Sequence, residues 1–159
     1  MIGMLAFGGS IWDVITAEAT YASTMRFATL LAFAAIGEWI AERAGTINIS
    51  IEGMILTGAF TAALGSHLTG NIWVGLLFGI VGGFLVAAVQ GIMSHRFGTN
   101  QFVVGLTLNV LAAGLTSFLD AQIDPKVTSA GRLEIPLLSD IPLVGTALFN
   151  QTWIQYLLY

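Results

Sequence analysis

The amino-acid sequence predicts an all-α membrane protein, a polytopic bundle of about four to five transmembrane helices. Hydrophobic residues make up 56% of the chain and charged residues only 9%, whereas a soluble domain carries about 25% charged residues to cover its surface. Several apolar runs approach the roughly 20 residues that a helix needs to cross a bilayer. We therefore expect one transmembrane domain over residues 1–159 and no sizeable soluble domain.

The predicted elements follow the chain in order. The start of the chain lacks the basic segment of a signal peptide and carries Asp13 and Glu18, so we expect it to be retained, at the membrane interface or in the first span. The predicted spans are Tyr21–Ala41, Ile47–Leu68, Asn71–Ser94, Gln101–Leu119 and, as the beginning of a fifth, Thr146–Tyr159. The second of these is interrupted near its start by Asn48 and Glu52.

The segment Asp120–Gly145 differs in composition from these spans. It contains the three prolines of the chain and six charged residues. Because proline fixes the backbone angle and removes a hydrogen-bond donor, this segment is predicted to be a folded loop rather than a helix through lipid. The few basic residues fall on both sides of the predicted spans, so the positive-inside rule leaves the topology open.

Small residues recur every four positions along the third predicted span. They are Gly75, Gly79, Gly83, Ala87 and Gly91. Small residues at this spacing let helix backbones approach closely, which is how helices associate in a membrane. The stripe predicts a helix-packing face, although glycine is also common in membrane helices in general.

Glu52 is the deepest carboxylate of the predicted spans. An acid at the centre of a transmembrane helix costs about 2.5 to 3.5 kcal/mol on insertion scales, so it usually faces protein or water. One interpretation is that Glu52 lines or gates a polar pathway. The other is structural: Glu52 would pair with Arg43, or lie in the first turn of a helix capped by Ser50, where a carboxylate is favoured.

Amide side chains form a second set of candidates for a substrate pathway. Amides donate and accept hydrogen bonds without charge, which suits the transient recognition of an uncharged polar solute. The set is Asn48, Asn100, Gln101 and Asn109. The alternative for Asn109 is hydrogen bonding between helices, and for Asn100 and Gln101 it is capping of a helix start.

The remaining polar residues indicate no catalytic site. Glu38, Glu42 and Arg43 are interpreted as a charge cluster at the membrane interface, and the isolated His67 and His95 make a metal site improbable. With no cysteine there is no thiolate chemistry. No protease, nucleotide-binding or nucleic-acid-binding motif is present, so we expect neither an enzyme nor a nucleic-acid partner.

Three separated stretches resemble one family of bacterial ABC-importer permeases, those for simple sugars and nucleosides, of the ribose-importer type and similar to branched-chain amino acid permeases. They are "GEWIAERAGTINISIEGMILTGAF" (Gly37–Phe60), "TNQFVVGLTLNVLAAGLTSFL" (Thr99–Leu119) and "IPLLSDIPLVGTALFNQ" (Ile135–Gln151). The resemblance runs from about Met25 to the end of the chain, with the motifs in the family's order.

The resemblance implies a multi-pass permease subunit of the bacterial cytoplasmic (inner) membrane. Its partners would be membrane lipid, a second permease subunit (homologous or identical), ABC ATPase subunits and an extracytoplasmic solute-binding lipoprotein. The permease itself would hold no cofactor, because ATP and magnesium would bind the partner ATPase. The loop Asp120–Gly145 would then lie on the extracytoplasmic side.

The sequence also departs from this family. Ser50 and Ile51 stand where a Gly-Leu pair is common, and the first span lacks the family's proline. Members of the family are about twice as long, so the chain corresponds to the N-terminal half. We therefore also consider a truncated, non-transporting subunit or scaffold that lacks the half that docks on the ATPase. An intramembrane enzyme is the third and weakest alternative.

Overall fold

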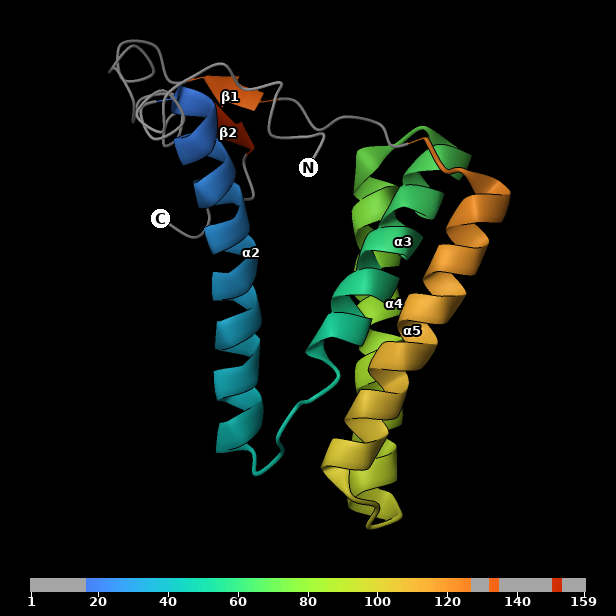
Figure 1. Cartoon of the computed structure of the whole chain (residues 1–159). Helices are drawn as coiled ribbons and strands as arrows, with labels where there is room; N and C mark the ends of the chain where they lie inside the picture. Colours follow the sequence, from blue (N-terminus) through green and yellow to red (C-terminus); the bar gives the residue numbers. More distant parts are fainter. Residues whose placement is uncertain (1–16, 127–131, 135–149, 153–159) are drawn as a thin grey trace, which may run out of the picture. The chain divides into compact units, whose positions relative to one another are not determined.

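The computed structural model describes residues 17–126, 132–134 and 150–152. Its elements are α2 (Glu18–Arg43), α3 (Ile51–Thr69), α4 (Ile72–Gly91), the π-helical turn η2 (Ile92–Arg96), α5 (Gln101–Ile123), β1 (Arg132–Glu134) and β2 (Asn150–Thr152) (Figure 1). The chain divides into two compact units, Ala34–Ala130 and a second made of Met1–Phe33 with Gly131–Tyr159. Each is described by itself.

Among the described residues, three helices are long and apolar enough to cross a membrane. They are Ala19–Arg43, Ile72–Arg96 and Gln101–Ile123. Each overlaps one predicted span, which confirms the helical, multi-pass membrane class. α3 is not among the three, since it carries Glu52, His67 and several hydroxyl residues.

α2 ends at Arg43 in a glycine-dependent turn. The Thr46 N–H donates to the Ala41 carbonyl over 3.0 Å, and the Gly45 N–H donates to the Glu42 carbonyl over 2.9 Å. This pair of bonds is the Schellman motif, which needs a left-handed residue just after the helix. Gly45 supplies it with φ +82°.

Residues 44–50, here named the α2–α3 connector, are not helical. Of the predicted span Ile47–Leu68, the first four residues are therefore not helical, and α3 begins at Ile51 directly after Ser50, as the structural interpretation of Glu52 expects. The local reason is Asn48, whose Oδ1 accepts the Ser50 N–H over 3.2 Å. Such a bond holds the backbone in a turn instead of a helix.

α3 and α4 pack through glycines on both helices. A Cβ at Gly79 would lie 3.0 Å from the Gly58 carbonyl oxygen, and one at Gly58 would lie 3.2 Å from that of Gly79. A Cβ at Gly75 would lie 2.8 Å from the Ala62 carbonyl oxygen, and a Cβ at Gly82 would collide with the side chain of Thr61. The two backbones are thus closer than any larger residue would permit.

The rest of the small-residue stripe lies differently. A Cβ at Gly83 would meet only the Met54 carbonyl, at 3.6 Å, and one at Gly91 would meet nothing within 4 Å. Ala87 lines a small pocket next to the connector. The glycines of α4 that contact α3 are Gly75, Gly79 and Gly82, which are spaced four and then three residues apart. This is the spacing of residues that share one face of a helix.

α4 continues into η2. After η2 the chain turns at Gly98, which has φ +62°, and α5 begins at Gln101. The Asn100 side chain caps α5 by accepting the Phe102 N–H over 2.9 Å. α5 runs four residues beyond its predicted end, to Ile123, and stops at the left-handed Asp124 before Pro125.

The two short strands lie in the other unit. β1 and β2 pair antiparallel, with Arg132 opposite Thr152 and Glu134 opposite Asn150. β1 falls in the predicted loop. β2 places Asn150–Thr152 in a strand, where the sequence predicts a fifth helix over Thr146–Tyr159. The remaining residues of that predicted span lie outside the described part of the chain.

Candidate functional site

The α2–α3 connector is held by amide side chains from two other elements. Gln101, at the start of α5, accepts the Ile47 N–H on its Oε1 over 2.8 Å. Gln90 of α4 binds the connector twice: its Nε2 donates to the Ile47 carbonyl over 3.1 Å, and its Oε1 accepts the Ser50 N–H over 3.2 Å. The backbone groups of Ile47 and Ser50, which lack helical hydrogen bonds, are therefore paired with side chains of α4 and α5.

Asn109 joins the middle of α5 to the start of α3. Its Nδ2 donates to the Ile49 carbonyl over 2.9 Å, and its Oδ1 accepts the Gly53 N–H over 2.8 Å. The first N–H groups of a helix have no partner within it. Asn109 supplies such a partner for the Gly53 N–H. It also supplies one for the carbonyl of Ile49, in the connector that precedes the helix.

Asn48 belongs to the connector itself and organises it locally. Its Oδ1 accepts from both the N–H and the hydroxyl of Ser50, each over 3.2 Å, and its Nδ2 donates to Met54 Sδ over 3.4 Å. The Asn48 N–H donates to Glu38 Oε1 over 3.1 Å. Glu38 thus binds the connector, and its place in a charge cluster at the membrane interface stays a prediction.

These contacts explain why non-helical backbone is tolerated between α2 and α3. In a membrane, unpaired backbone groups are costly, and irregular backbone occurs only where protein or water satisfies it. Gln90, Gln101 and Asn109 do so here. The structural alternative for Asn109, hydrogen bonding between helices, is realised in the structure. Capping is realised by Asn100, whereas Gln101 binds the connector instead, and the role of all three in a pathway stays a prediction.

Gln90 is the residue that sequence reasoning missed. It is only 2% exposed and makes two of the bonds that hold the connector. The signal was available: Gln90 is a lone amide inside an otherwise apolar span, and polar residues at such positions face protein.

Glu52 stands apart from this network. Ser50 is the N-cap residue of α3, as expected, but its side chain makes no capping bond, and Glu52 lies exposed in the first turn. The guanidinium of Arg43 instead lies 4.5 Å from the centre of the Trp39 ring. Within residues 17–126, Glu52 has no hydrogen-bonding or ion-pair partner among the side chains.

The two histidines lie far apart and bind different loops. His95 Nε2 is 2.5 Å from Oγ1 of Thr46 in the connector, whereas His67 Nδ1 accepts the Lys126 N–H over 3.3 Å. Over the part of the chain that is described, no group of three or more His, Cys, Asp or Glu side chains could hold a metal ion.

Comparison with known proteins identifies relatives of this chain. A family described as the permease component of branched-chain amino acid transport systems matches residues 20–140. A putative glucose ABC transporter permease of Haloferax volcanii is 36% identical over 85% of this chain and 43% of its own length. A nucleoside ABC transporter permease of Lactococcus lactis is 30% identical over 87% of this chain and 47% of its own.

A guanosine ABC transporter permease of Bacillus subtilis is a further relative, 31% identical over 82% of this chain and 45% of its own length. The chain thus spans about half the length of the curated relatives it matches. No solved structure matches it significantly.

Proposed function

Because the chain belongs to this family of ABC transporter permeases, we propose that it forms part of the translocation path of an importer for a nucleoside or a simple sugar. The observation that carries the proposal is the likeness to permeases named for nucleosides, guanosine and glucose. These names favour a conducting permease over a non-transporting scaffold. Nucleosides are the first substrates to test, followed by simple sugars.

The proposed assembly needs further components. Residues 1–159 would form the first part of one permease domain, which pairs with a second permease subunit in the bacterial cytoplasmic membrane. ATPase subunits would bind ATP and magnesium and hydrolyse the nucleotide, so this chain itself would not be an enzyme. An extracytoplasmic lipoprotein would deliver the solute to the side of the loop Asp120–Gly145.

The interrupted start of α3 supports a transport role. Transporters often carry discontinuous helices whose ends lie near the solute, and here the connector replaces helix at residues 44–50. Glu52 lies exposed in the first turn of α3, directly after the connector. We propose Glu52 as a path residue, with Asn48, Asn109, Gln101 and Asn100 forming or supporting the wall around it.

The test is uptake by the full-length subunit assembled with its ATPase, its permease partner and its lipoprotein in proteoliposomes. We expect ATP-dependent uptake of radiolabelled guanosine or glucose, abolished when the ATPase is inactivated. An assembled complex that hydrolyses ATP but accumulates neither class of solute would contradict the proposal.

A further inference from the structure

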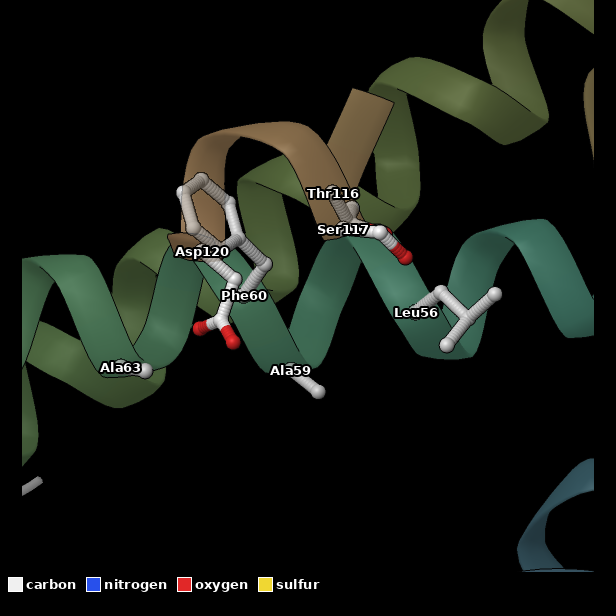
Figure 2. A pocket seen from close by; sticks show the side chains of 7 residues that line it. All are labelled: Leu56, Ala59, Phe60, Ala63, Thr116, Ser117 and Asp120. Atoms are coloured by element: carbon white, nitrogen blue, oxygen red, sulfur yellow. The ribbon is translucent and has the colours of Figure 1, made fainter. Parts of the chain in front are cut away.

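A groove of about 320 Å³ lies between α3 and α5, on a face that the connector contacts do not use. α3 lines it with Leu56, Ala59, Phe60 and Ala63, and α5 lines it with Thr116, Ser117 and Asp120. In Figure 2 the hydroxyl of Ser117 and the carboxylate of Asp120 both project from α5 over the side of α3 that carries Ala59 and Leu56.

The three polar residues of the groove are not equivalent. Thr116 is 9% exposed, and its hydroxyl donates to the Ala112 carbonyl over 2.7 Å. Ser117 and Asp120 are exposed, and neither side chain has a hydrogen-bonding partner within residues 17–126. The groove therefore offers one free hydroxyl and one free carboxylate beside an aromatic ring.

Glu52 lies on the same face of α3 as the groove. Residues four apart share a helix face, so Glu52 is in line with Leu56 and Phe60, and Ala63 follows in that line. At 1.5 Å per residue, the line from Glu52 to Ala63 extends about 16 Å along α3. An exposed carboxylate thus stands at each end of one face, Glu52 at the start of α3 and Asp120 near the end of α5.

This face is not suited to lipid. Carboxylates within membrane helices are costly unless they meet water or protein. The combination of carboxylate, hydroxyl and aromatic ring instead fits a neutral polyhydroxylated solute. Its hydroxyl groups would donate to Asp120 and Ser117, while its less polar ring face would lie against Phe60 and Leu56. The volume is at the lower end of the range for small-molecule sites.

We infer that the α3–α5 groove is a wall of the solute path and binds a neutral polyhydroxylated solute such as a ribonucleoside. Asp120 and Ser117 accept hydrogen bonds from the solute's hydroxyl groups, and Glu52 lines the same path further along the same face of α3. This inference rests on the proposed function and adds Asp120, Ser117 and Phe60 to the residues that touch the solute.

The first experiment compares Asp120→Asn with Asp124→Asn in the assembled full-length transporter. The two carboxylates are one turn apart, but Asp124 does not line the groove, and its left-handed backbone accommodates asparagine. We expect Asp120→Asn to raise the half-saturating concentration for guanosine uptake at least fivefold. Asp124→Asn should stay within twofold of the unaltered protein.

The second experiment uses the absence of cysteine from residues 1–159. In an otherwise cysteine-free full-length subunit, Ser117→Cys places one thiol in the groove. Gln122→Cys places one on an exposed position about 140° round the same helix, at 100° per residue. Guanosine should slow maleimide labelling of Ser117→Cys at least fivefold and leave Gln122→Cys unchanged.

The outcomes separate this inference from the proposed function. Protection of Ser117→Cys in a complex without uptake supports the groove and contradicts the transport proposal. Normal uptake with no protection and no effect of Asp120→Asn overturns the groove alone. If Asp120→Asn prevents the subunits from assembling, the groove is a surface for helix packing, and the inference is wrong.

Discussion

The N–H of Gly53 donates to Asn109 Oδ1 over 2.8 Å, and a Cβ at position 53 would lie 3.0 Å from that same oxygen. The glycine therefore lets the amide approach, and the amide completes the hydrogen bonding of the glycine. Residues 56 positions apart are thus matched in size as well as in polarity. Neither can be changed without loss to the other.

The first prediction concerns Asn109→Leu. The substitution leaves the Gly53 N–H and the Ile49 carbonyl without their partner, and each buried unpaired group costs about 1–3 kcal/mol. We expect a lower melting temperature in detergent, whereas Gln122→Leu at an exposed site should change the free energy of unfolding by no more than about 0.5 kcal/mol. An unchanged melting temperature combined with lost uptake would instead favour a role for Asn109 in the path.

The second prediction concerns Gln90→Leu. This change removes both bonds from α4 to the connector while keeping a side chain of similar bulk. Hydrogen exchange followed by mass spectrometry should show faster exchange in peptides that contain Ile47 and Ser50. Peptides from the C-terminal half of α3 serve as the internal control. Equal exchange in the connector would mean that Gln90 does not hold it.

The third prediction contrasts two glycines of the same stripe. Gly75→Ala places a Cβ 2.8 Å from the Ala62 carbonyl oxygen, and such overpacking costs about 1–3 kcal/mol. Gly91→Ala meets nothing within 4 Å and should stabilise its helix by about 0.5–1 kcal/mol. Thermal unfolding of the two variants should therefore shift in opposite directions. A stabilising Gly75→Ala would refute the close α3–α4 contact.

The fourth prediction concerns Glu52→Gln in the full-length subunit. Glu52 is exposed and has no described side-chain partner, so the substitution should leave assembly and melting temperature unchanged. Uptake should fall, because we propose that Glu52 lines the solute path. Measuring both in one preparation separates the two roles, because a purely structural Glu52 would lower the melting temperature together with uptake.

The sequence predicted the helices of this fold well, because length and apolar composition are local properties. It located the spans that correspond to α2, α4 and α5, and it placed polar residues at the start of α3. The sequence could not show which backbone groups the polar side chains bind. Gln90 and Asn109 bind residues about 40 and 60 positions away, and only the packing of the helices brings those groups together.

Two local features depend on contacts that the sequence does not display. The predicted span begins at Ile47 and is interrupted near Asn48 and Glu52. In the structure the Asn48 side chain accepts the Ser50 N–H and stabilises a turn, so the helix begins only at Ile51. Glu38 was assigned to an interfacial cluster because Glu42 and Arg43 are its neighbours in sequence. Its Oε1 also accepts the Asn48 N–H, a contact that depends on how the chain turns after Gly45.

The α2–α3 connector has a mechanical consequence. A helix keeps its shape through its own repeating bonds, whereas this segment takes its shape from Gln90 on α4 and from Gln101 and Asn109 on α5. If α4 slides against α5, the connector cannot remain bonded to both helices, so it must follow one and release the other. A displacement at that helix pair is thereby passed directly to the first turn of α3, where Glu52 lies.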